Sequence, residues 1–326
     1  MRRCFLLLFC LVSLGIFGQD SGWSRAWQPA DSLNKLRFWT VSSTGAAIAG
    51  GTVFGLYHLW YKDYPTSRFH FFNDWDEWKN LDKAGHTLTA YNECVWGYHS
   101  FRWMGVSKRN AIWTAFGLGT MLQLSLESLD GISEKWGFSV GDVAFNTLGC
   151  VTFAAQQFGW GEQRIVLKAG SWHGPYSDAV VLSTDGLAQT TLRRRAAELY
   201  GTRYAQTFFK DYNAMSTWAS VNVASFLPED TWVPRWLNVA VGYGADNLFA
   251  GYDNTWEQDG HTFVVSPLLY PASRQFFLSL DLDLTKFKTK PGPVRVLLFV
   301  LNSIKVPSPT LEINSLGRAK FHGIYF

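Results

Sequence analysis

The sequence lacks a strong charge of either sign. Its 29 Lys and Arg residues nearly balance 26 Asp and Glu residues, so the formal net charge is only +3 over 326 residues. No basic stripe concentrates this excess, and we therefore do not expect a nucleic-acid partner. The chain also lacks HExxH, GxGxxG, Walker and CxxC motifs, internal repeats and low-complexity segments. No standard catalytic signature identifies a reaction.

The first residues have the pattern of a secretory signal peptide. Residues 1–18 combine Arg2 and Arg3 with a short apolar run at 5–16 and the small residue Gly18. The alternative is an uncleaved first membrane helix, although about 15 apolar residues is short for a span. Cleavage after Gly18 would accompany export of the protein past the inner membrane.

Cysteine is scarce. The chain has four cysteines, and removal of residues 1–18 leaves only Cys94 and Cys150. Both lie in helical patterns, so they are interpreted as small buried side chains or, in an oxidising compartment, as a disulfide. Cys10 lies inside the apolar run with no lipobox before it, which gives no support to lipidation there.

Aromatic residues, in contrast, are abundant at 17%. Such rings gather where one edge is wet and the other dry, as at membrane interfaces. Residues 38–61 carry no full charge and are long enough to cross a bilayer as a helix. This segment predicts a transmembrane helix, and the alternative is a buried helix of a water-soluble bundle. Small residues recur every fourth position along it, at Ser43, Ala47, Gly51 and Gly55.

Three further apolar, helix-like segments follow between residues 73 and 160, and each carries polar residues at helical spacing. Because a helix advances about 100° per residue, residues spaced by three or four lie on one face. Three helices with such stripes would turn them toward a shared interior. The stripes are Asp82, His86, Thr89 and Glu93, then Gln123, Glu127 and Asp130, then Asp142, Asn146 and Gln156.

After Trp160 the pattern changes, because charges become frequent and long apolar segments cease. Residues 276–285 alternate between leucine and Ser or Asp, which predicts a strand with one apolar face and one wet face. Residues 234–241 suggest a short helix. The predicted fold class is mainly α: an apolar bundle of about four helices, followed by a mixed α/β region with a few antiparallel strands. The predicted divisions are a signal peptide (1–18), a polar segment (19–37), a membrane-associated helical core (38–160) and the mixed C-terminal region (161–326).

The sequences DKAGH at 82–86 and FSVGDVAFNTLG at 138–149, with Glu127 between them, resemble the VanZ-like membrane proteins. The chain is more similar to the YfiM-like group of predicted periplasmic lipoproteins and its longer Bacteroidetes-type members, whose pattern extends to FNDWDEW and to KDYN at 210–213. The likeness covers roughly residues 55–220. It implies a helical membrane core and a location in the cell envelope of a Gram-negative-type bacterium, at the inner or the outer membrane, but no established reaction.

The ionisable residues of the three stripes support two functional hypotheses. In the first, a non-enzymatic envelope membrane protein uses an interior polar cluster to hold helices in register and to bind a lipid head group. In the second, a membrane-embedded hydrolase uses a divalent metal, zinc or manganese, to cleave a lipid ester or phosphodiester. The sequence indicates membrane lipid as a partner and gives no oligomeric state. The catalytic candidates are Asp82, His86, Glu127, Asp130 and Asp142; the metal candidates are Asp82, His86, Glu127 and Asp142; and the structural cluster is Asp82, His86, Glu93, Gln123, Glu127, Asp142 and Asn146.

Overall fold

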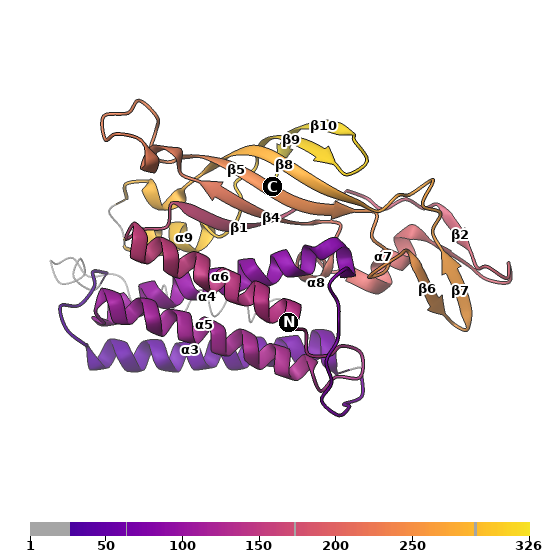
Figure 1. Ribbon diagram of the computed structural model, residues 1–326, viewed down its shortest axis with the longest axis horizontal. Coiled ribbons are helices and arrows are strands. Elements are labelled where there is room, and N and C mark those ends of the chain that lie inside the picture. The colour runs from indigo at the N-terminus through magenta and orange to yellow at the C-terminus, as the bar shows by residue number, and fades with distance from the viewer. Residues whose placement is uncertain (1–26, 63, 173, 290–291) are drawn as a thin grey trace.

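A computed structural model describes residues 27–62, 64–172, 174–289 and 292–326, and the expected signal peptide lies outside them. The chain forms a layer of long helices and an antiparallel sheet that lies against it (Figure 1). The helices of the layer are α3 (Lys35–Leu56), which a π-helical turn extends to Tyr61, α4 (Leu81–Met104), α5 (Lys108–Asp130) and α6 (Val140–Gly159).

Serine caps and small residues shape this layer. Ser107 and Ser139 precede α5 and α6, and each hydroxyl accepts a hydrogen bond from the backbone three residues later. A Cβ added at Gly119 would lie 2.8 Å from the Sγ atom of Cys94 and 3.4 Å from that of Cys150. The glycine therefore lets α4, α5 and α6 approach closely. Both cysteines are buried free thiols at this contact.

The predicted bundle of about four apolar helices is wrong. Among the long helices of the described part of the chain, only α4, α5 and α6 share a buried core, which is built from residues such as Tyr91, Ile112 and Phe153. Helix α3 lies at the edge of the layer, and most of its side chains are exposed. Its many Gly, Ala, Ser and Thr residues offer little side chain to bury.

The prediction of a transmembrane helix is also contradicted. Across the residues that the structure describes, none of the helices combines the length and the apolarity needed to cross a bilayer. The uncharged run at 38–61 is shared between α3, which begins earlier at Lys35 and ends at Leu56, and the π-helical turn.

The second layer makes the fold α plus β, in place of mainly α. Six of the described strands form one antiparallel sheet in the order β1-β4-β5-β8-β9-β10. Helix α4 packs against its β1, β4 and β5 strands. The strands are β1 (Ile165–Ser171), β4 (Met215–Val221), β5 (Leu237–Asp246), β8 (Ser273–Leu282), β9 (Ser308–Asn314) and β10 (Ala319–Tyr325).

Shorter elements surround this sheet. Two hairpin-like pairs, β2 with β3 and β6 with β7, project at one end of the molecule beside α7 (Figure 1). Their bounds are β2 (Val180–Leu182), β3 (Gln189–Thr191), β6 (Thr255–Gln258) and β7 (His261–Val264). The short helices are α7 (Leu192–Tyr200), α8 (Tyr204–Lys210) and α9 (Gly292–Leu301), with 3-10 turns η2 (Glu77–Asn80), η3 (Val223–Phe226) and η4 (Leu284–Lys286).

The sheet turns its polar side chains inward. On β8, Leu278 and Leu280 are 51% and 48% exposed, whereas Ser279 and Asp281 are 5% and 1% exposed. The expected strand is therefore present, but the prediction that its Ser and Asp face is wet is wrong. The acid tolerates burial because Asp281 pairs with Lys168 at 2.7 Å.

Candidate functional site

Lys83 lies at the centre of the polar cluster. It is the third residue of α4, its side chain is 1% exposed, and its ammonium faces three carboxylates. The Nζ atom lies 2.6 Å from Asp142, 2.7 Å from Asp74 and 3.5 Å from Asp82. A buried ammonium needs such partners because leaving it unpaired in a low dielectric is very costly.

Asp82, His86 and Asp142 form a candidate metal-binding triad. Each offers one ligand atom, and these atoms lie within 4.8 Å of one another. The Nε2 atom of His86 is 3.7 Å from Asp82 Oδ2 and 3.5 Å from Asp142 Oδ1. The side chains of Asp82 and His86 are 26% and 22% exposed, so solvent reaches this side of the cluster.

Two neighbours fix the ring of His86. Its Nδ1 atom is 3.1 Å from Asn146 Oδ1 and 3.7 Å from Glu127 Oε1. Because an amide oxygen accepts hydrogen bonds, Nδ1 is the donor and Nε2 faces Asp82 and Asp142. Partners of this kind orient a histidine ligand and fix its tautomer.

Ser139 joins the cluster to the start of α6. Its hydroxyl donates to Asp74 at 2.7 Å and accepts from the backbone N–H of Asp142 at 3.0 Å. Its own backbone N–H donates to Glu127 at 3.4 Å. Ser139 is therefore a helix cap, and the carboxylate of Asp142 faces Lys83.

The cluster holds more acid than its cations neutralise. Burial raises the pKa of Glu127 to about 8, and it also raises the pKa of Asp142. Burial opposes the charges of Lys83 and His86, but Asp82, Asp142 and the other nearby carboxylates raise the pKa of both bases. Glu127 therefore holds a proton at neutral pH unless another cation approaches.

An unusual backbone segment leads into the site. Trp78, Lys79 and Asn80 all have left-handed conformations, with φ values of 49°, 55° and 65°. Such a run is strained for residues other than glycine and needs tertiary support. Trp78 stacks on Tyr212 with ring centroids 4.6 Å apart, and the Tyr212 hydroxyl donates to Asp82 Oδ1 at 3.1 Å. The C-terminal region thus helps to position Asp82.

The remaining predicted residues lie outside this centre. Asp130 accepts a hydrogen bond from the hydroxyl of Tyr61 at 2.6 Å. Glu93 lies two helical turns beyond His86 on α4, where burial raises its pKa to about 7 and Gln123 opposes the rise. Gln156 lies near the C-terminal end of α6, where it bonds to Ile165 of β1. The stripes therefore continue through the helical layer, but His86 is approached only by Asp82 on its own helix, Glu127 near the end of α5, and Asp142 and Asn146 near the start of α6 among the predicted residues.

Sequence reasoning missed Lys83, although it lies within DKAGH, and it also missed Asp74 and Tyr212. Asp74 and Tyr212 belong to FNDWDEW and KDYN, two sequences that were used only as marks of resemblance. Both lie in irregular segments, so helical spacing gives no signal for them. Their presence in FNDWDEW and KDYN was the one feature of the sequence that could have indicated them.

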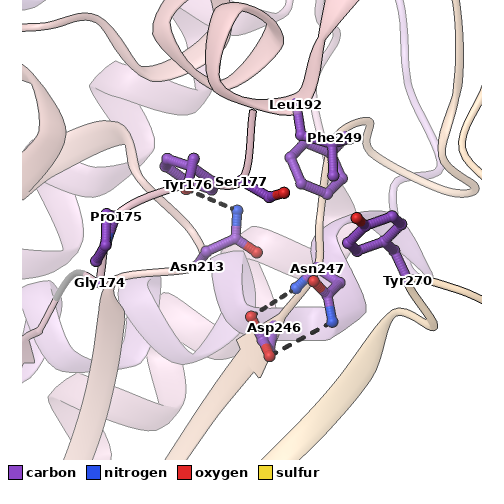
Figure 2. A pocket seen from close by; sticks show the side chains of 10 residues that line it. All are labelled: Gly174, Pro175, Tyr176, Ser177, Leu192, Asn213, Asp246, Asn247, Phe249 and Tyr270. Carbon is purple, nitrogen blue, oxygen red and sulfur yellow. Dashed lines mark hydrogen bonds between the residues drawn. The ribbon is translucent and has the colours of Figure 1, made fainter. Parts of the chain in front are cut away.

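A pocket lies at the end of β5, beside Asp246 (Figure 2). It has a volume of about 270 Å³, and Asn213 is central to it. The Asn213 amide donates to the hydroxyl of Tyr176 at 3.0 Å and to the carbonyl of Leu248 at 2.8 Å, while its oxygen accepts from the N–H of Leu248. The nitrogen and the oxygen of the Asn213 amide both have hydrogen-bond partners within the protein. Asn213 therefore gives no sign of a missing ligand in this pocket.

No family model, curated protein or solved structure matches this chain. The likeness to the YfiM-like and VanZ-like groups therefore stays a prediction. The site rests on its geometry alone.

Proposed function

We propose that this protein binds a divalent cation through Asp82, His86 and Asp142 and uses it to hydrolyse an ester or phosphodiester bond. The observation that carries the proposal is the convergence of the three ligand atoms within 4.8 Å. An envelope location, which residues 1–18 and the family resemblance suggest, belongs to the same proposal.

The distances favour a cation of ordinary size. Zinc bonds to nitrogen and oxygen of about 2.0–2.2 Å place two ligands of a tetrahedral site about 3.4 Å apart. The separations from His86 to Asp142 and Asp82 are 3.5 and 3.7 Å. The raised pKa values of the buried acids add support, because a divalent cation replaces protons on such groups. Two carboxylates and one imidazole suit zinc or manganese.

Three protein ligands leave coordination positions open, which is typical of catalytic sites. A cation held in this way polarises the bond to be cleaved and acidifies water. Glu127, whose Oε1 atom is 3.7 Å from the ring of His86, holds a proton at neutral pH because burial raises its pKa to about 8. A bound cation would displace that proton, and Glu127 would then be the nearby group able to accept one. Lys83, already held by three acids, supplies fixed positive charge.

The position of Lys83 favours a second candidate function. If this ammonium satisfies the acids by itself, the cluster only holds α4, α6 and the loop before α4 in register. A site of that kind needs no cation, and the protein would then be a non-enzymatic component of the envelope.

Titration calorimetry with Mn²⁺ and with Zn²⁺ distinguishes the two candidates. The cation proposal expects one site per chain in the wild type, loss of at least about 100-fold in affinity for His86→Gln, and no change for His99→Gln, a matched histidine at an exposed position of α4. No binding of either metal to the wild type, or equal binding by both variants, leaves the structural candidate.

Hydrolysis is measured separately with bis-p-nitrophenyl phosphate and a p-nitrophenyl ester. Glu127→Gln should lower the rate about 10²–10⁴-fold while the cation still binds. A protein that binds the cation but hydrolyses neither compound at any pH would retain the binding site and lose the proposed reaction.

A further inference from the structure

An apolar groove lies between the second half of α3 and the end of α5. Its volume is about 410 Å³, which is within the range of small-molecule sites. Gly50, Val53 and Phe54 of α3 line one side, and Leu126 and Leu129 of α5 line the other. No residue of this lining belongs to the cation triad, so the groove is a separate feature.

One polar group in the lining is unmet. The side chain of Ser133 is buried, with the residue 5% exposed, and its Oγ atom has no hydrogen-bond partner among the described residues. Such a group is costly to bury, and a ligand atom is one explanation for it. The ligand would therefore carry a polar end as well as an apolar body.

A nearby lysine indicates that the polar end of the ligand is negatively charged. Lys135 follows Ser133 by two residues in the same loop and is exposed, and its ammonium donates a hydrogen bond to the hydroxyl of Tyr64. No carboxylate in the described part of the chain pairs with it. Its Nζ atom lies 4.2 Å from the ring centre of Tyr64, which lines the groove, and 5.0 Å from that of Trp136. An ammonium that is held beside an apolar groove by Tyr64 and has no carboxylate partner among the described residues is complementary to an anionic head group.

We propose that this groove binds a single acyl chain with an anionic head group, such as a free fatty acid. The chain lies between α3 and α5, Ser133 donates its hydroxyl hydrogen to a head-group oxygen, and Lys135 provides the opposite charge. The apolar walls supply affinity, and the loop supplies selectivity for the anion.

The probe for the test is a dansyl-labelled undecanoic acid, followed by its fluorescence, with its neutral methyl ester as the paired ligand. Gly50→Phe fills the groove, and Gly45→Phe is the matched control on the same helix. A Cβ added at either glycine meets no atom within 4 Å, so both variants should fold. We expect Gly50→Phe to weaken binding of the acid at least about tenfold and Gly45→Phe to leave it unchanged.

The loop is tested with the same pair of ligands. Lys135→Gln should weaken binding of the acid about fivefold without affecting the ester, and Lys108→Gln, at another exposed lysine, should affect neither. Ser133→Ala should also weaken binding of the acid. Because it removes an unmet buried hydroxyl, it should not lower the melting temperature of the free protein.

Several outcomes overturn this proposal. One is absence of binding, and another is equal binding by the two phenylalanine variants. Binding that appears only after residues 1–18 are removed would show that the chain's own apolar run fills the groove. If Gly50→Phe instead converts a dimer into a monomer and leaves fatty-acid binding intact, a second copy is the occupant. Calorimetry with Mn²⁺ on Gly50→Phe keeps failure of the groove distinct from failure of the cation site.

Discussion

At the scale of the residue, Lys83 carries the largest energetic consequence. Replacing it with methionine leaves Asp74 and Asp142 buried without their cation. We expect Lys83→Met to lower the free energy of unfolding by about 3–5 kcal/mol, measured by urea denaturation without metal. Lys108→Met, at an exposed position, should change it by less than about 0.5 kcal/mol. Similar stabilities for both variants would mean that Lys83 does not neutralise the acids.

Asn146 gives the second residue-scale prediction. Its amide oxygen, 3.1 Å from His86 Nδ1, fixes the ring without contacting the proposed cation. Asn146→Ala should therefore weaken Mn²⁺ binding about 10–100-fold while the chain stays folded. Thr147→Ala, at an exposed position on the same helix, is the control for calorimetry. An unchanged affinity in Asn146→Ala would remove the orienting role.

The site shows which residues a sequence can reveal. Helical spacing indicated Asp82, His86 and Asp142, because residues three or four apart on a helix face the same direction. It could not indicate that Lys83 lies at the centre, since adjacent residues on an ideal helix point about 100° apart. Asp74 and Tyr212 were hidden for a different reason, because irregular segments have no period to read.

At the scale of the element, the sheet has reversed polarity. Leu278→Lys on β8 replaces an outward side chain that is 51% exposed, so it should cost less than about 1 kcal/mol. The next residue, Ser279, is 5% exposed and bonds to Thr310 and Ser308. Ser279→Val should cost about 1–3 kcal/mol. Urea denaturation of the two variants checks this order, and the opposite order would contradict the reversed polarity.

The same polarity explains why the strands were difficult to predict. Strand β5 begins at Leu237, within the segment that was interpreted as a short helix. Its inward positions include Asn238, Ala240 and Gly242, which are small or polar residues that do not resemble a buried face. Apolar residues do alternate along β5, but they point outward. An ordinary strand pattern assigns its apolar residues to the buried face.

At the scale of the whole molecule, a rise in pH should destabilise the metal-free protein, and a bound cation should offset that loss of stability. Burial raises the pKa of Glu127 to about 8 and that of Glu93 to about 7, above their ordinary values. The folded state thus binds more protons than the unfolded state between about pH 4.5 and 8, and His86, with its raised pKa, acts in the same direction. Stability must then fall as pH rises through this range.

We therefore expect the melting temperature of the metal-free protein to be lower at pH 8 than at pH 5.5, and Mn²⁺ to raise it more at pH 8. Scanning calorimetry at both values, with and without Mn²⁺, measures this. His86→Gln should remove the effect of Mn²⁺ and leave most of the pH dependence. A melting temperature that increases toward pH 8 without metal would contradict the raised pKa values.

The contact between the layers has a consequence for synthesis. Asp82 is held by the hydroxyl of Tyr212, which lies 130 residues further along the chain. When α4, α5 and α6 have left the ribosome, Asp82, His86 and Asp142 have all been synthesised. Tyr212, whose hydroxyl positions Asp82, has not. Until the strand after Tyr212 emerges, the nascent helices carry their acids without this restraint, and early capture of metal ions would be weak.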